Sequence, residues 1–153
     1  MKHLILITIV TLLSTITQAK CPDLQGNYTC NRAGMKNGHF DLTVSQQVID
    51  DVTNYTFDIN DGTNVNTYEA NGIPQVEETD DAFELKTIKC EDGKLFGEES
   101  EVAKNKSFKT EILWNWAGSR RGRLTHNIAI YHTKGPDGDR TPIMSATDKC
   151  RKR

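Results

Sequence analysis

The sequence predicts an all-β fold, an antiparallel up-and-down barrel of about eight or nine strands that is linked by disulfides. Short runs of alternating apolar and polar residues recur along the chain, and clusters of Asn, Asp and Gly separate them. Beyond the N-terminal segment, no stretch of about ten or more residues has a clean helical period. Such runs also fold into sandwiches, but the absence of obvious long crossovers favours the barrel.

The N-terminal segment has the organisation of a secretory signal peptide. Lys2 precedes an apolar run at residues 4–13, and Ala19 completes a small-residue cleavage motif. We therefore expect residues 1–19 to be removed and residues 20–153 to form a single β-barrel domain. The mature protein would be secreted or periplasmic and would have no transmembrane span.

Two alternatives for this N-terminus stay open. A permanent membrane anchor is one, although the apolar run is too short for a span and has the wrong flanks. Lipid attachment at Cys21 is the other, and the charge of the preceding Lys20 argues against it.

Four strands are expected in the first half of the mature chain. In each, apolar residues on one face alternate with polar residues on the other. Asn60-Asp61-Gly62 is a hairpin turn of the kind that needs positive φ, and Asp50-Asp51 also turns the chain. The expected strands are residues 21–30, 40–48, 55–59 and 65–70.

The second half continues in the same manner after an acidic connection at residues 73–81. Residues 98–105 are charged and lack a clear period, so we expect an irregular segment there. Residues 151–153 are expected to be a frayed basic tail. The expected strands are residues 83–90, 94–96, 108–116, 124–131 and 143–150.

Four cysteines allow three disulfide pairings. If residues 24–30 are extended, Cys21 and Cys30 are up to ~30 Å apart, whereas a disulfide needs Cα atoms within about 7 Å. In a closed antiparallel barrel the first strand pairs with the last, which predicts Cys21–Cys150 and Cys30–Cys90. A bent loop at residues 24–30 would instead allow Cys21–Cys30. A zinc site is disfavoured because no C-x-x-C pair is present.

Gly26-Asn27-Tyr28, near the mature N-terminus, resembles the Gly-x-Trp start of the lipocalin-like (calycin) barrels. This chain has Tyr28 where the family usually has Trp, and Arg151 is a poor match for the arginine that covers that ring. The resemblance implies a cavity for a small, largely apolar ligand, and no catalysis. The small periplasmic lysozyme-inhibitor barrels of bacteria are similar in size, export and disulfide use, but no segment here matches their inhibitory loop.

The best candidate for a ligand pocket is an aromatic strand face. Two Trp side chains on one face suggest a cavity or an interface, because Trp is large and its N–H needs a partner. An ordinary packed core is the alternative. We expect a non-enzymatic protein that carries a small apolar or amphipathic ligand. The predicted ligand-binding residues are Phe108, Ile112, Trp114, Trp116, Tyr55, Phe57 and Tyr28.

Charge is divided along the chain. Residues 20–101 hold 17 acidic and 6 basic side chains, whereas residues 102–153 hold 4 acidic and 12 basic ones. Mutual attraction and solubility are one explanation. The other is an anionic surface or protein partner, bound through Arg120, Arg121 and Arg123 of an exposed loop. The alternative function is therefore an inhibitor or interaction module that uses this loop. No nucleic-acid partner is expected.

No catalytic constellation emerges from the sequence. His126 and His132 lie on one strand face but roughly 20 Å apart, too far to share a metal. No Gly-x-Ser-x-Gly elbow is present, and the Asp58–Gly62 segment lacks the Glu that ends an EF-hand loop. We expect no catalytic residue, no metal ligand and no cofactor, and hence a protein that is not an enzyme.

Overall fold

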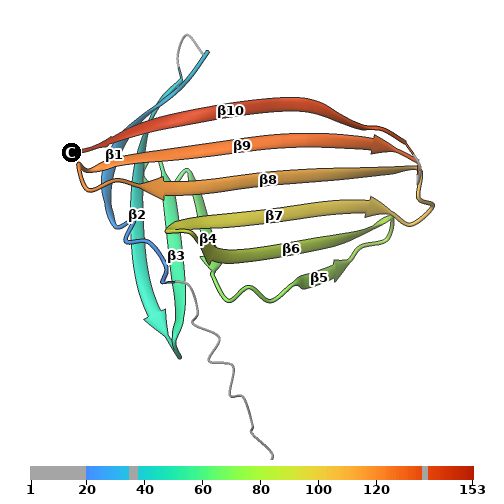
Figure 1. The fold of residues 1–153 in the computed structure, drawn as a ribbon, viewed down its shortest axis with the longest axis horizontal. Coiled ribbons are helices and arrows are strands. Elements are labelled where there is room, and N and C mark those ends of the chain that lie inside the picture. The colour runs from blue at the N-terminus through green and yellow to red at the C-terminus, as the bar shows by residue number, and fades with distance from the viewer. Residues whose placement is uncertain (1–19, 35–37, 136–137) are drawn as a thin grey trace, which may run out of the picture.

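The structure is a computed structural model, and it describes residues 20–34, 38–135 and 138–153. These residues form ten strands and no helix (Figure 1). The predicted signal peptide, residues 1–19, lies outside the described residues. The strands are β1 (Gly26–Arg32), β2 (His39–Ile49), β3 (Val52–Ile59), β4 (Asn64–Glu69), β5 (Gln75–Glu78), β6 (Ala82–Glu91), β7 (Lys94–Ala103), β8 (Phe108–Gly118), β9 (Arg123–Lys134) and β10 (Arg140–Lys152).

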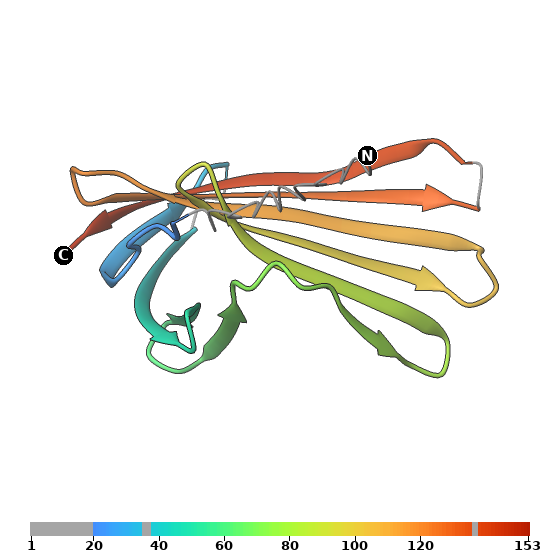
Figure 2. The ribbon, with the colours of Figure 1, turned by 60° about the horizontal axis from the view of Figure 1, so that its bottom comes forward.

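All ten strands belong to one sheet, in the order β4-β3-β2-β1-β10-β9-β8-β7-β6-β5. The first strand pairs with the last, as predicted, and all paired neighbours are antiparallel. The sheet curls, so that β1 to β4 fold back across one end of the long strands β6 to β10 (Figure 2). The predicted all-β, antiparallel, up-and-down architecture is confirmed, as a half-barrel with β4 and β5 at the two edges of the sheet.

The tight turns between strands follow from the local sequence. Asp50 and Asp51 have φ of 49° and 64°, and Asp92 and Gly93 have φ of 49° and 70°. Two successive residues with positive φ match the right-handed twist of a hairpin, and Asp and Gly adopt this conformation most readily. The turn predicted at Asp50-Asp51 is therefore confirmed.

The predicted disulfide pairing is wrong. Cys21 is bonded to Cys90, and Cys30 is bonded to Cys150. The register of β1 and β10 places Cys30 directly opposite Cys150, with their Cα atoms 4.0 Å apart. Since β1 begins only at Gly26, Cys21 precedes the strand, and the register of the pair offers it no partner within β10, which ends at Lys152. The N-terminal segment instead reaches the end of β6.

Three further segments differ from the prediction. The acidic connection contains β5, the charged residues 98–103 continue β7, and Arg151 and Lys152 belong to β10. Each segment pairs through its backbone with a neighbour, for example Glu101 with Thr110 and Arg151 with Thr29. Backbone pairing does not require an alternating side-chain pattern, so the sequence pattern missed these strands.

The core lies on the concave face of the curl, which we call the inner face. The segment before β1 crosses one end of it: Leu24 is fully buried, and Tyr55 Oη donates a hydrogen bond to Pro22 O at 2.6 Å. Tyr28 Oη donates to Leu24 O at 2.9 Å. These bonds and the Cys21–Cys90 disulfide fix the segment over the core.

Candidate functional site

The strands β8 and β9 present two different faces, because successive side chains of a strand point to opposite sides. The inner face carries Trp114 and Trp116, which are each only 6% exposed. The opposite face, which we call the outer face, carries Leu113 and Asn115 at the alternate positions of β8. The predicted ligand site belongs to the inner face, and a separate groove lies on the outer face.

On the inner face, Trp116 is enclosed by other rings. It stacks on Phe57 with ring centroids 4.8 Å apart and on His126 with centroids 4.1 Å apart. Phe57 in turn contacts Tyr68 edge-on, with centroids 5.6 Å apart. Offset-stacked and edge-to-face pairs of this kind stabilise a core beyond the apolar area that they bury.

The structure brings five of the seven predicted ligand-binding residues into one buried cluster. Ile112 packs against the edge of this cluster, as does Phe40. Phe108 lies outside it, half-buried and stacked on His132 with centroids 5.8 Å apart. A ligand role for these residues stays a prediction. The five clustered residues are Tyr28, Tyr55, Phe57, Trp114 and Trp116.

A charged network lies beside Trp116. Asp148 is 1% exposed, and Arg32 donates to both of its carboxylate oxygens at 2.7 and 2.8 Å. His126 Nδ1 lies 3.0 Å from Asp148 Oδ2. Burial lowers the pKa of His126 below 6.5 despite the attraction of Asp148. Burial alone would raise the pKa of Asp148, but the bonds from Arg32 and His126 hold it below its usual value.

Trp114 points to the inner face, and the outer groove also reaches it. Its indole Nε1 donates to Glu99 Oε1 at 3.0 Å, and its ring lies 4.8 Å from that of Tyr68. The ring covers Gly97, which is opposite Trp114 on β7, and a Cβ atom at Gly97 would collide with it. Gly97 and Trp114 both lie in the floor of the groove on the outer face.

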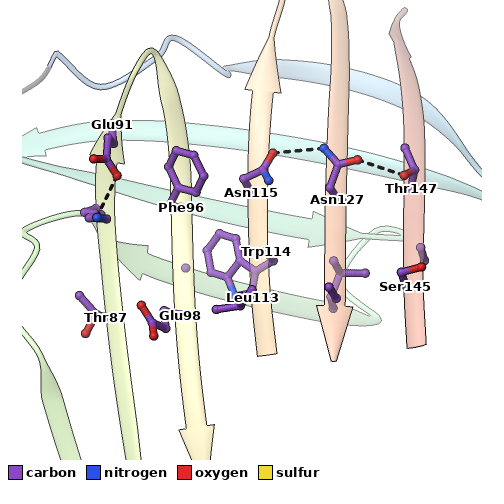
Figure 3. A pocket seen from close by; sticks show the side chains of 15 residues that line it. Thr87, Glu91, Phe96, Glu98, Leu113, Trp114, Asn115, Asn127, Ser145 and Thr147 are labelled. Atoms are coloured by element: carbon purple, nitrogen blue, oxygen red, sulfur yellow. Dashed lines mark hydrogen bonds and ion pairs between the residues drawn. The ribbon is translucent and has the colours of Figure 1, made fainter. Parts of the chain in front are cut away.

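This outer groove has a volume of about 550 Å³ and crosses β6 to β10 (Figure 3). Its apolar part consists of Phe96, Leu113 and Ala129, together with Trp114. Phe96 and Leu113 are only half-buried, so both present apolar surface to the groove. An apolar groove of this size that also contains a few convergent polar groups is the usual form of a small-molecule site.

The polar part of the outer groove is a row of three side chains, Asn115, Asn127 and Thr147, which we call the polar row. Asn127 Nδ2 donates to Asn115 Oδ1 at 3.2 Å, and Thr147 Oγ1 donates to Asn127 Oδ1 at 3.0 Å (Figure 3). Amide and hydroxyl groups can form more hydrogen bonds than this row uses. The polar row can therefore both donate to and accept from an uncharged group.

Charged side chains border the groove on β6 and β7. Lys89 and Glu91 pair at 2.8 Å, and the Glu91 hydrogen bond raises the pKa of Lys89 above its usual value. Glu98 is exposed on the same border. The charges of Lys89 and Glu91 offset each other. Glu98 therefore accounts for the net negative charge of these three residues.

The predicted partner-binding arginines lie at the opposite end of the molecule from the β5–β6 turn, near the C-terminus (Figure 1). Arg120 and Arg121 are in the turn between β8 and β9, and Arg123 begins β9. The three arginines line a groove of about 510 Å³. Their role in binding a partner stays a prediction.

Sequence reasoning did not select Phe96, Leu113 or the polar row. A signal was present, since Leu113 and Ala129 are apolar residues at positions where the outer face is otherwise polar. Gly97 opposite Trp114 was a second signal, but it depends on the register of β7 and β8, which the sequence does not give.

The described residues contain no group of three or more His, Cys, Asp or Glu side chains arranged to hold a metal ion. None of those residues forms a helix long and apolar enough to cross a membrane. Comparison of the sequence with protein-family models and with curated proteins found no match to either.

Proposed function

We propose that this protein is a non-enzymatic binding protein that holds a small amphipathic ligand in the outer groove. The main support for the proposal is that an apolar wall and the polar row lie side by side in one groove of about 550 Å³. On the inner face, the ring of Trp116 is already covered by Phe57 and His126. This packing favours the outer face as the place where a ligand binds.

The groove specifies the chemistry of its ligand. An apolar group packs against Phe96, Leu113 and Ala129 and is removed from water there, which is favourable by about 25 cal/mol per Å² of apolar surface. An adjacent hydroxyl, amide or ether group bonds the polar row. A purely apolar ligand would leave that row without a partner and would bind less tightly.

Secretion and the lipocalin-like resemblance belong to the same proposal. Two disulfides support an oxidising compartment, as does the expected signal peptide. Gly26-Asn27-Tyr28 and the pairing of β1 with β10 support a barrel related to the lipocalin type. The alternative of an interaction module rests on the exposed arginines of the β8–β9 turn, without a comparably shaped apolar site.

The proposal is tested with a single tryptophan as reporter. The chain has two Trp residues, so Trp116→Phe leaves Trp114 alone, in the floor of the groove. We expect its fluorescence to change saturably when a panel of monomeric detergents with different headgroups is titrated. Circular dichroism of the variant establishes that it is folded, and calorimetry on the unaltered protein gives an independent affinity.

Blocking variants give the control. Ala129→Leu adds bulk within the groove, and we expect it to abolish binding. Thr43→Leu makes a comparable change on the outer face of β2, away from the groove, and should leave binding intact. If no detergent of the panel binds, or if Ala129→Leu binds as well as the unaltered protein, the proposed function is wrong.

A further inference from the structure

We propose that the ligand of the outer groove is an anionic amphiphile, whose charged group is bound by Arg123, Lys149 and Arg151. We call these three residues the cationic end. The inference rests on the proposed function, because it places the charged group on the same face as the groove. It adds a second binding subsite and the charge of the ligand.

The strand register assembles the cationic end from segments that are distant in sequence. Arg123 on β9 is directly opposite Arg151 on β10, and Lys149 is two residues before Arg151. Cys150, between those two residues, is buried on the inner face in its disulfide with Cys30. Lys149 and Arg151 therefore point to the outer face, because side chains alternate along a strand.

The cationic end lacks compensating negative charge. Like charges directly opposite each other on neighbouring strands are destabilising. Among the described residues, none of the three forms an ion pair with a carboxylate. Asp41, on the same face of β2, is paired instead with Arg153 at 3.2 Å. An anionic group would relieve this repulsion and would be attracted by the local field.

The cationic end follows the polar row along the outer face of β9 and β10. Asn127 and Thr147 of the polar row are opposite each other, and the next outer pair along β9 and β10 is Thr125 and Lys149. Arg123 and Arg151 form the pair after that, about 13 Å from the polar row at roughly 3.3 Å per residue. Thr125 and Arg123 both line the groove at the β8–β9 turn, which extends the recessed surface in this direction.

The order of groups along the outer face gives the order of groups in the ligand. Leu113 and Ala129, the outer pair beyond the polar row, bind the apolar part, the polar row binds an uncharged hydrogen-bonding part, and the cationic end binds the anion. The exposed carboxylate of Glu98 at the other end of the groove would repel an anion there. The two ends of the face therefore favour one orientation of the ligand.

Calorimetry with detergents of equal chain length tests this inference. The probes are dodecanoate, uncharged dodecyldimethylamine oxide and cationic dodecyltrimethylammonium, each below its micelle concentration and at slightly alkaline pH. We expect dodecanoate to bind the unaltered protein about tenfold or more tightly than the uncharged probe, and the cationic probe to bind most weakly. Added salt should reduce this preference, since the cationic end is exposed.

Charge-matched variants identify the subsite. Arg123→Gln combined with Arg151→Gln should weaken dodecanoate binding about tenfold and leave the uncharged probe unchanged. Lys106→Gln combined with Lys134→Gln removes the same charge at the other end of β8 and β9, and should change dodecanoate binding less than threefold or so. Circular dichroism and thermal unfolding establish that both variants are folded.

The outcomes separate this inference from the proposed function. Equal binding of anionic and uncharged probes to the unaltered protein would leave the proposed function in place and overturn the anionic subsite. Equal losses in the two double variants would also overturn it, because the effect would then come from net charge. Binding of none of the probes would overturn both proposals.

Discussion

The two faces of β8 differ in how closely their side chains are packed. Trp116 on the inner face is 6% exposed and lies between two rings, whereas Leu113 on the outer face is half-buried beside an open groove. The residues are three apart in sequence and belong to the same strand. Inner positions should therefore determine stability, and outer positions should determine binding. The following predictions test that division, beginning with the largest expected effect.

The Cys30–Cys150 disulfide should give the largest effect on stability. It joins residues 120 positions apart, and a loop of that length contributes roughly 4–5 kcal/mol on the chain-entropy model. Cys30→Ser combined with Cys150→Ser should lower the free energy of unfolding in urea by about that amount. Removing Cys21–Cys90, which spans 69 positions, should cost only about 0.5 kcal/mol less on the same model. A much larger difference between the two variants would contradict the entropic account.

Trp116 and Leu113 provide the direct comparison of the faces. Trp116→Ala should lower the free energy of unfolding by about 3–5 kcal/mol, because it leaves a cavity between Phe57 and His126. Leu113→Ala should cost about 1 kcal/mol or less, since Leu113 borders an open groove. Detergent binding should weaken in Leu113→Ala and persist in the milder variant Trp116→Phe. The reverse pattern of binding would place the ligand on the inner face.

Gly97 tests the contact between the faces. In Gly97→Ala the new methyl group collides with the indole of Trp114, so the ring must move and its bond to Glu99 is disturbed. Overpacking of this kind costs about 1–3 kcal/mol, and displacement of the groove floor should also weaken binding. Urea unfolding and detergent calorimetry measure the two effects. If neither the free energy of unfolding nor detergent binding changed, the ring of Trp114 would not cover Gly97 as it does in the structure.

Stability should fall in two steps on acidification. The folded pKa of His126 is below 6.5 and that of Asp148 is below 3.8, so the unfolded chain takes up protons at higher pH than the folded protein. The contribution of His126 is present above pH 6.5 and is lost as the pH falls from there through the folded pKa. The contribution of Asp148 is lost in the same way below pH 3.8.

Urea unfolding at a series of pH values measures these steps. His126→Gln should remove the upper step and leave the lower one. A rise in the free energy of unfolding between pH 7 and pH 5 in the unaltered protein, instead of a fall, would mean that His126 is charged in the folded state.

The sequence predicted the fold better than it predicted the site. Alternation and turn residues were sufficient for most strands and for the pairing of β1 with β10. The pairing of Cys30 with Cys150 depends on where β1 begins, and that boundary depends on the position of the N-terminal segment across the core. Local sequence patterns contain no information about such contacts.

The outer groove was missed for a related reason. It is formed by side chains from β6 to β10 that converge only through register, as Asn115, Asn127 and Thr147 do. The predicted aromatic face was recognised because its pattern lies within one strand. A site assembled across five strands requires the structure.

The most direct test of the proposed site compares two adjacent side chains of β8. Ile112 points to the inner face and Leu113 to the outer face. In the NMR spectrum of the protein saturated with dodecanoate, we expect intermolecular NOEs from the alkyl chain to the methyl groups of Leu113 and Ala129. NOEs to the methyl groups of Ile112, without any to Leu113, would place the ligand on the inner face and contradict the account.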